Sequence, residues 1–248
     1  MIDAEIAKRA AEFRNGLIAA LTSNCSEVLQ KNTFKIDEAY ARLTCLQSLR
    51  AYLIADVTSE GSQGFFVEAQ ADGLTSLVLI LTGAPRSALK SLRSLIENVI
   101  RSIYYADHPI EYRQWEDDNH RPTFKSLFDY LDAHPDLQGL NEKLQPQKTL
   151  HSNWKMLSQA VHSSAKAERM TGNTETIQIW KTTQAAVGKW ATFQKAVIRD
   201  VCLLYFILYR EKLKGGGFKP VRESATIALP KNLDLRIKED LGIRLVRK

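Results

Sequence analysis

The sequence predicts an all-α protein, and three observations lead to that prediction. Of its 248 residues, 44% are hydrophobic, which is enough to bury one large core and excludes disorder of the whole chain. Only 12 glycines and 7 prolines interrupt it, too few for the many tight turns of a β-sandwich. Apolar residues recur every three or four positions over long stretches, as on one face of an α-helix.

The first part of the chain predicts four helices. Periodic apolar positions place them at about 2–21, 35–57, 74–81 and 85–108. Residues 58–64, TSEGSQG, have the composition of a loop. The third helix is apolar on nearly every face, so we expect it to be central in the core. Pro85 suits the first turn of the fourth helix, where its missing N–H costs nothing.

The second part predicts shorter helices, then a long one and a tail. The helices are expected at about 110–116, 122–133, 149–163 and 175–213. Gly215, Gly216 and Gly217 end the long helix. We therefore predict a helical bundle domain over residues 1–214 and a glycine-hinged C-terminal tail over 215–248. The tail mixes a short strand or extended arm with a short terminal helix.

The basic charge of the chain lies in this tail. From Lys212 onward there are ten Lys or Arg against four Asp or Glu, an excess of six, which equals the net charge of +6 of the whole chain. Residues 1–211 are therefore formally neutral. A basic tail can hold a polyanion such as RNA by neutralising phosphates, but an ordinary solvated segment has the same composition.

The compartment can also be predicted from composition. Cys25, Cys45 and Cys202 are an odd number without close spacing, which indicates neither a disulfide framework nor a cysteine zinc site. The N-terminus carries acidic residues where a signal peptide needs a basic segment. The longest apolar runs are shorter than the roughly 18–20 residues that span a bilayer. We expect a soluble, cytoplasmic protein without a membrane segment.

The helix expected over 85–108 carries a polar edge beside its apolar stripe. Arg93, Glu97 and Arg101 are spaced by four residues, so that both pairs can form ion pairs along the helix. Tyr104 borders the same edge, and His108 follows Arg101 by two turns. Such an edge is most often a solvated ladder of ion pairs, and a histidine before a proline is often a helix terminator. The alternative is a site in which arginine and histidine act together.

The spacing of Arg101 and His108 resembles a known signature. An Arg, four to six residues and then a His, late in a helix of an all-α domain, is similar to the motif of the HEPN superfamily, and Arg101-Ser-Ile-Tyr-Tyr-Ala-Asp-His108 fits it. Similar bacterial proteins combine a SLRSLIEN-type helix with a later LSxxVHxS segment, here Leu157 to Ser164. The likeness spans about residues 85–165. The residue after the arginine is Ser102, where the family often has Asn, Asp or His.

The resemblance implies a HEPN-like helical bundle, usually dimeric, and a metal-independent ribonuclease of toxin–antitoxin, abortive-infection or other antiviral systems. RNA carries its own nucleophile, the 2′-hydroxyl, so cleavage needs proton transfer and a cation on the phosphate. Histidine titrates near neutrality, and arginine grips phosphate oxygens in a bidentate manner. We predict Arg101 and His108 as catalytic residues, with Glu97 orienting Arg101.

A second polar stripe lies on the helix expected at 149–163. His151, Lys155, Ser158 and His162 are spaced by four, three and four residues, so they share one face. If this face meets Arg101 across the bundle, His162 is a second or alternative catalytic histidine; otherwise the stripe is an ordinary polar surface. The predicted RNA-binding residues are Arg93, Tyr104, Lys155 and Ser158.

Other chemistries are less well supported. Ser158 lacks the nucleophile elbow of a hydrolase, and the glycine run lacks the Lys-Ser/Thr of a phosphate loop. The WEDDNH stretch has no metal-ligand spacing, so no metal or cofactor is predicted. The tryptophans are expected in the core or a dimer interface rather than as base-stacking platforms; they are Trp115, Trp154, Trp180 and Trp190.

Three functions remain open from the sequence. The first is a HEPN-like endoribonuclease that acts on RNA as a toxin or defence effector, forms a homodimer and is restrained by an antitoxin or other defence-system partner protein. The second is a catalytically inactive helical adaptor that binds a partner protein or a nucleotide through the same polar edge. The third is nucleic-acid binding through the basic tail.

Overall fold

The computed structural model describes residues 2–162 and 182–247. Within these ranges the chain forms helices joined by turns and short loops and no strand, so the all-α prediction is confirmed. The long helices are α1 (Ile2–Leu49), α3 (Glu60–Leu81), α4 (Pro85–Asp107), α7 (Pro146–His162) and α8 (Gln184–Leu208). The short helices are α2 (Ala55–Val57), α5 (Pro109–Glu116), α6 (Phe124–Ala133), α9 (Arg210–Leu213), α10 (Lys219–Ala228) and α11 (Asp234–Leu241).

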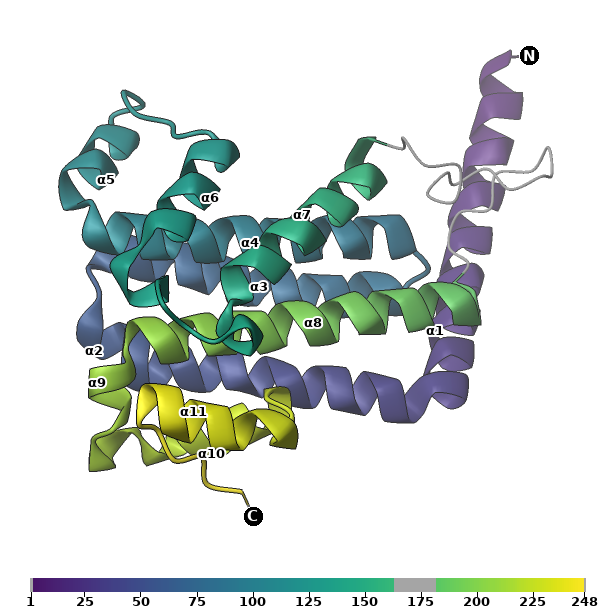
Figure 1. Cartoon of the computed structure of the whole chain (residues 1–248). Coiled ribbons are helices and arrows are strands. Elements are labelled where there is room, and N and C mark those ends of the chain that lie inside the picture. Colours follow the sequence, from purple (N-terminus) through teal and green to yellow (C-terminus); the bar gives the residue numbers. More distant parts are fainter. Residues whose placement is uncertain (1, 163–181, 248) are drawn as a thin grey trace.

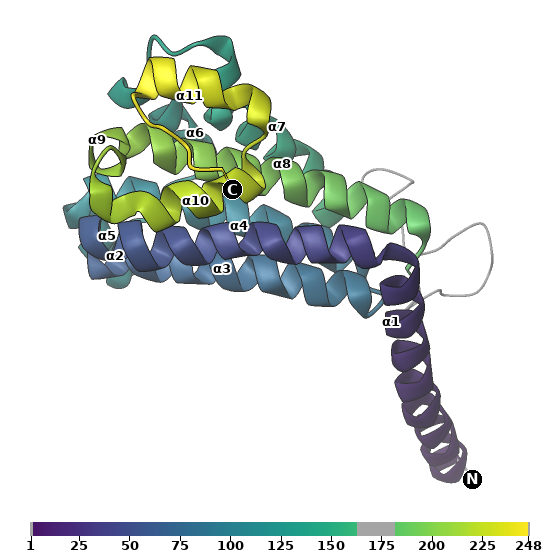
Figure 2. The same ribbon diagram turned by 90° about the horizontal axis from the view of Figure 1, so that it is seen from below.

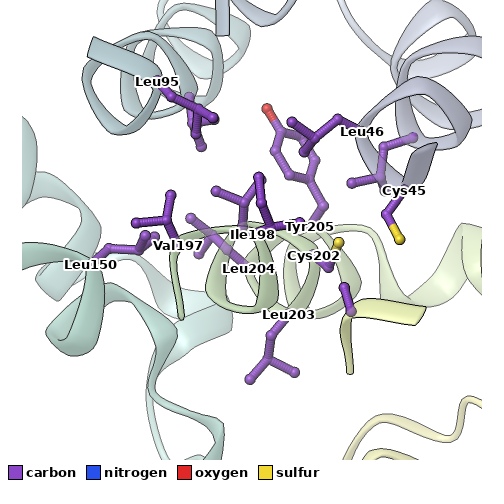
Figure 3. Packing of buried hydrophobic residues seen from close by; sticks show 14 of the residues in the cluster. Cys45, Leu46, Leu95, Leu150, Val197, Ile198, Cys202, Leu203, Leu204 and Tyr205 are labelled. Carbon is purple, nitrogen blue, oxygen red and sulfur yellow. The ribbon is translucent and has the colours of Figure 1, made fainter. Parts of the chain in front are cut away.

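Helix α4 lies at the centre of the bundle. It packs against α3, α7 and α8, and the C-terminal part of α1 covers α3 and α8 (Figures 1 and 2). The apolar stripe predicted for α4 is buried, with Leu92, Ile96 and Ile100 fully covered. Figure 3 shows side chains of α1, α4, α7 and α8 meeting in this core. Because three helices cover α4, only one narrow edge of it is left for function.

Helix α1 joins two helices that the sequence predicts to be separate. The predicted break between residues 21 and 35 is reduced to a kink at Asn32, which has φ −134° and ψ 19°. The Asn32 side-chain amide donates a hydrogen bond to the Val28 carbonyl at 3.1 Å, which serves the backbone at the kink. Asn24 and Val28, just before the kink, are still buried against the bundle, and the part of α1 that precedes them projects away from it (Figure 2). Ile6, Phe13 and Ile18 of this arm are more than half exposed.

Helix α3 begins earlier than predicted. The loop expected at 58–64 is limited to its first residues, because Ser59 caps the helix by accepting a hydrogen bond from the Ser62 N–H at 3.5 Å. The following glycines, Gly61 and Gly64, are tolerated inside the helix although each costs about 1 kcal/mol relative to alanine. A good N-cap together with buried Phe65 and Phe66 therefore outweighs the glycines.

By length and composition alone, α3 is the one helix of the described chain that could cross a membrane. The helix packs against α1 and α4, and Phe66, Ala69 and Ile80 are fully covered. The opposite face of α3 is open, because Val67, Leu74 and Val78 are 40, 43 and 56% exposed, so the expectation that this helix is central in the core holds for one face only.

The helices after α4 follow the predicted order. Helices α5, α6 and α7 correspond to the predictions at 110–116, 122–133 and 149–163. Of the long helix expected at 175–213, residues 175–181 lie outside the described part of the chain. The structure begins α8 at Gln184, where Thr183 accepts a hydrogen bond from the Ala186 N–H at 3.1 Å. It ends α8 at Leu208, before the separate short helix α9.

The residues after Gly215 pack onto the bundle. The strand or extended arm expected there is replaced by α10 and α11. Val221, Ala225, Ile237 and Leu241 belong to the same buried cluster as α1 and α8. Removing residues 215–248 would uncover this core, so a truncation at Gly215 tests folding rather than nucleic-acid binding.

Arg247 holds the end of the chain in place. Its guanidinium donates hydrogen bonds to the Thr226 and Leu229 carbonyls, both at 2.9 Å. Its Nε and Nη2 also bond the two carboxylate oxygens of Asp234 at 2.6 and 2.5 Å. These bonds join the last residues to α10 and to the start of α11.

We expect Arg247→Gln to lower the free energy of unfolding by about 1–3 kcal/mol, because it removes hydrogen bonds of a charged donor. Urea denaturation followed by circular dichroism measures this change. Arg244→Gln is the matched control, since Arg244 is exposed, and should stay within about 0.5 kcal/mol of the wild type. Equal stability of both variants and the wild type would contradict the role of Arg247.

Candidate functional site

The predicted polar edge of α4 divides into two parts. In the first, the Nε of Arg93 lies 2.9 Å from Oε1 of Glu97, at an angle that does not make a hydrogen bond. The indole N–H of Trp154 on α7 donates a hydrogen bond to the same Glu97 oxygen at 2.8 Å. The Arg93 guanidinium lies 5.0 Å from the centre of the Trp154 ring. The charges of Arg93 and Glu97 thus serve to join α4 to α7.

This arrangement corrects the role predicted for Glu97. The carboxylate was expected to orient Arg101, but it contacts Arg93 and Trp154, and within the described residues no ion pair joins it to Arg101. The side chains of Arg93 and Glu97 are only 20% and 16% exposed. A partly buried pair of this kind is costly to disturb, since removing one partner leaves the other charge uncompensated. Arg93 and Glu97 are therefore structural residues of this edge.

Arg101 forms the second part of the edge and has no carboxylate partner in the described chain. Within the described residues its side chain donates a single long hydrogen bond, of 3.5 Å, to the side-chain oxygen of Asn98. The guanidinium carbon lies 4.7 Å from the ring centre of Phe124 on α6 and 6.0 Å from that of Phe65 on α3. Aromatic rings fix the position of a guanidinium without neutralising it. Arg101 therefore retains its charge and N–H donors for another ligand.

Ser102, next to Arg101, points into the core. Its hydroxyl donates a hydrogen bond to the Ser62 carbonyl at 2.8 Å, and the Ser62 hydroxyl donates one to the Ser102 carbonyl at 2.5 Å. The hydroxyl of Tyr205 on α8 donates to Ser102 at 3.2 Å. The position that departs from the HEPN pattern thus belongs to helix packing in this chain.

Arg101 lines a pocket of about 250 Å³ at one end of α4. Its other walls come from α4, α5 and the segment before α6: Tyr105, Trp115, Arg121 and Pro122. Arg121 is exposed and makes a short contact with the carboxylate of Asp118. The sequence did not predict this pocket. Its lining residues follow no periodic pattern along the chain, and they come together only because α5 folds back beside α4.

An aromatic cluster packs behind the walls of the pocket. The Tyr105 ring stacks on Phe65 with centres 5.3 Å apart, and Trp115 meets Phe65 at 4.9 Å. Tyr112 completes the cluster, with its ring 5.8 Å from that of Trp115. Burial raises the pKa of the Tyr105 phenol to about 12, so the group stays a neutral hydrogen-bond donor at neutral pH.

His108 ends α4 with its ring stacked on Tyr104, the centres 4.2 Å apart and the planes 11° from parallel. Its Nδ1 lies 2.8 Å from the Tyr104 carbonyl oxygen. A carbonyl can only accept, so Nδ1 carries the proton of the neutral ring and Nε2 has a free lone pair. In the described chain no residue hydrogen-bonds Nε2. His108 can therefore accept a proton, although it is not among the residues that line the Arg101 pocket.

A hydrogen-bonded network of α4 and α6 lies beside His108. The Tyr130 hydroxyl makes a short hydrogen bond to the Asp107 carboxylate, and Nε2 of His134 lies 3.3 Å from the same oxygen. The His134 Nδ1 accepts a hydrogen bond from the Asp136 N–H at 3.2 Å, so Nε2 carries the ring proton toward Asp107. The Tyr130 ring also meets His108 edge to face at 5.0 Å. These contacts fix the end of α4 and the direction of the His108 ring.

The polar stripe of α7 does not reach the pocket. Lys155 is exposed, and the Ser158 hydroxyl donates a hydrogen bond to the Trp154 carbonyl of its own helix at 2.7 Å. His151 stacks on Phe128 at 4.1 Å, and burial lowers the pKa of its ring. None of the residues lining the Arg101 pocket comes from α7. His162 is the last residue of α7, and its side chain lies outside what the structure describes.

The histidine and acidic residues near α5 do not form a metal site in the described chain. Within residues 2–162 and 182–247 no three His, Cys, Asp or Glu side chains are grouped so that they could hold a metal ion. His120 lies near Tyr104, with ring centres 6.5 Å apart, and its buried Nε2 lacks a hydrogen-bond partner in the described chain.

We expect Gly61→Ala to displace α5 and alter the pocket. An alanine Cβ at this position would lie 2.0 Å from the Tyr112 ring, so the ring must move, and Trp115 with it. The variant should change the near-ultraviolet circular dichroism of the aromatic cluster and lower stability by about 1–3 kcal/mol. Gly64→Ala on the same helix meets open space and should preserve the spectrum while raising stability by up to about 1 kcal/mol, the helix-propensity gain of alanine over glycine. A Gly61→Ala spectrum identical to that of the wild type would refute this docking contact.

The network around Asp107 makes a prediction about pH. The hydrogen bond from His134, aided by that from Tyr130, holds the pKa of Asp107 below its ordinary 3.8 despite partial burial. A lowered pKa stabilises the folded state above pH 3.8, and this contribution is lost as the pH falls through the folded-state pKa. His134→Ala and Tyr130→Phe should each raise the Asp107 pKa, measured by carboxyl carbon NMR, whereas His151→Ala should leave it unchanged. A lower pKa in either network variant would contradict the assignment.

Comparisons with known proteins give no family for the chain. No family model matches it, and neither the curated proteins nor the solved structures contain a match.

Proposed function

We propose that this protein is a HEPN-like, metal-independent endoribonuclease that acts as a toxin or antiviral defence effector. One observation carries the proposal. Helix α4 bears Arg101, which has no carboxylate partner among residues 2–162 and 182–247, and ends at His108, whose Nε2 has no hydrogen-bond partner there. These are the two kinds of group that RNA cleavage needs, and they occur in the order and spacing that resemble the HEPN motif.

Each residue has a distinct role in this reaction. The Nε2 of His108 takes the proton of the 2′-hydroxyl, whose oxygen then attacks the adjacent phosphorus. Arg101 binds the non-bridging phosphate oxygens and stabilises the additional negative charge of the transition state. The P–O5′ bond breaks, and the leaving oxygen receives a proton from a second donor. The products are a 2′,3′-cyclic phosphate and a 5′-hydroxyl.

The proton for the leaving oxygen comes from a second histidine. In a homodimer this is the equivalent histidine of the second copy, and His162 is the alternative donor. Tyr104 acts by supporting the His108 ring, with which it stacks. Lys155 is exposed and can contact the RNA backbone outside the pocket, whereas the Ser158 hydroxyl is already bonded to its own helix. A partner protein that covers this end of α4 would restrain the activity.

A second candidate function is binding without cleavage. The observation in its favour is that His108 does not line the Arg101 pocket. In this alternative the protein is a catalytically inactive adaptor that uses Arg101 to bind a nucleotide or an acidic group of a partner protein. It shares the dependence on Arg101 with the ribonuclease but not the dependence on His108.

We expect Arg101→Ala and His108→Ala each to lower the rate of RNA cleavage by at least about 100-fold, because each removes a group that acts in the transition state. The assay follows total RNA and a labelled oligonucleotide with purified protein, and growth of expressing cells is the second measurement. The matched control is Arg113→Ala, which removes an exposed arginine of α5. Melting temperatures should stay close to that of the wild type.

The outcomes separate the two functions. Cleavage that both variants retain at the wild-type rate would rule out the ribonuclease proposal. A wild-type protein that binds RNA through Arg101 and cleaves no RNA would support the adaptor. Loss of cleavage in Arg101→Ala and His108→Ala, with Arg113→Ala active, would support the ribonuclease.

A further inference from the structure

The pocket beside Arg101 contains two groups that the cleavage reaction does not use. Arg121 and Trp115 share its walls with Arg101, Tyr105 and Pro122. Trp115 lies near the end of α5 and Arg121 in the segment before α6, whereas Arg101 and Tyr105 lie on α4. A ligand bound in this pocket would therefore contact both α4 and the α5–α6 segment.

The charges of the pocket favour an anion. Two guanidinium groups, those of Arg101 and the exposed Arg121, line a volume of about 250 Å³ and make its wall positively charged. The Asp118 carboxylate contacts Arg121 but is 77% exposed, so water screens much of its charge. Asp118 is not a lining residue, and Arg101 has no acidic partner within the described chain. A phosphate group fits, because arginine binds its oxygens through two parallel N–H donors.

The remaining walls favour a flat ring. Trp115 is partly exposed, and its indole N–H has no hydrogen-bond partner in the described part of the chain. One side of its ring system is supported by Phe65 and Tyr112, at 4.9 and 5.8 Å between centres. Rigid aromatic groups in a basic groove are the platforms on which bases of single strands stack. The indole of Trp115 is thus held in place while part of it faces the pocket.

The size of the pocket limits the ligand. Its volume of about 250 Å³ lies just below the about 300–1,000 Å³ of pockets for drug-sized ligands. One phosphate and one base fit a space of this size. The ligand should therefore be a single nucleotide unit.

We propose that this pocket is the binding site for one nucleotide of single-stranded RNA, next to the phosphate that is cleaved. The cleaved phosphate, which Arg101 binds in the proposed reaction, lies between Arg101 and Arg121, and the base of the adjoining nucleotide stacks on Trp115. The inference rests on the proposed action on RNA and adds a substrate class, unpaired RNA, and two specificity residues. A free nucleotide has the same chemistry, so the experiment must separate the two sources.

The experiment measures binding of the full-length protein to a fluorescently labelled ten-nucleotide RNA without secondary structure, over a series of salt concentrations. To prevent cleavage, the 2′-hydroxyls of the RNA are replaced by 2′-methoxy groups. Arg121→Gln should weaken binding about tenfold and reduce the slope of log affinity against log salt by about 0.7, the value for one phosphate contact in a single strand. Trp115→Leu should weaken binding by about 5- to 100-fold without changing the slope, because stacking is not ionic.

Lys125→Gln is the matched control for charge. Lys125 is exposed on α6, pairs with Asp129 as Arg121 pairs with Asp118, and does not line the pocket. Lys125→Gln also removes one positive charge, but no phosphate contact. The affinity should therefore stay within about twofold of the wild type, and the salt slope within about 0.2. Trp115→Phe keeps an aromatic ring and should retain most of the affinity, which distinguishes lost stacking from lost packing.

The results have separate consequences for the inference and for the proposed function. Equal effects of Arg121→Gln and Lys125→Gln would overturn the nucleotide site, even if cleavage still depends on His108. Selective loss in Arg121→Gln and Trp115→Leu would support the site, even if His108→Ala remained active and the ribonuclease proposal failed. Adenosine monophosphate that binds as tightly as the RNA would overturn the RNA assignment in favour of a free nucleotide.

Discussion

The close contact between α3 and α4 determines where the candidate site lies. Ser62 and Ser102 exchange hydrogen bonds between hydroxyls and carbonyls, and Tyr205 adds a third bond from α8. Small side chains permit this approach, and the polar atoms that it buries are satisfied. Since Ser102 is fixed toward the core, the geometry of the helix turns Arg101 by about 100° to the border of the bundle. A packing contact thus sets the direction of the residue that we assign to phosphate binding.

Contacts with α7 determine which arginine of α4 pairs with Glu97. Glu97 could in principle serve either of two arginines one turn away, Arg93 or Arg101. The Trp154 indole, which donates to Glu97 and lies against Arg93, favours the first of these. Desolvated partners strengthen an ion pair, because the local dielectric is lower than at the surface. The aromatic side chain of another helix therefore decides which arginine stays without a carboxylate.

The sequence carried most of the information for α4 and little for the pocket. Apolar periodicity and Pro85 located α4 correctly, since both depend on residues within a few turns of one another. The predictions of a break near Asn32 and of a loop over residues 58–64 were wrong. Capping and tertiary packing at these positions outweigh the intrinsic preference of Ser, Asn and Gly for loops. The packing of α10 and α11 on the bundle was missed for a related reason. A run of glycines indicates a turn, but it does not indicate whether the residues that follow pack back onto the same core.

The same distinction applies to the candidate site. Arg101 and His108 could be selected because they lie on one helix, at a spacing that sequence displays. Arg121 and Trp115 could not, since their nearness to Arg101 depends on the docking of Tyr112 over Gly61, a contact between α5 and α3 that no periodic pattern encodes.

Arg101 and His108 are held by different contacts, although they share a helix. The rings of Phe124 and Phe65 surround the Arg101 guanidinium, whereas the Tyr104 ring and the edge of Tyr130 fix the His108 ring. The two supports meet on α6, which contributes Phe124 at its start and Tyr130 two turns later. Position and orientation of the two groups relative to each other are consequently set by how α6 lies on α4. A change at Asp107 or His134 would reach His108 first and Arg101 only if α6 moved as a whole.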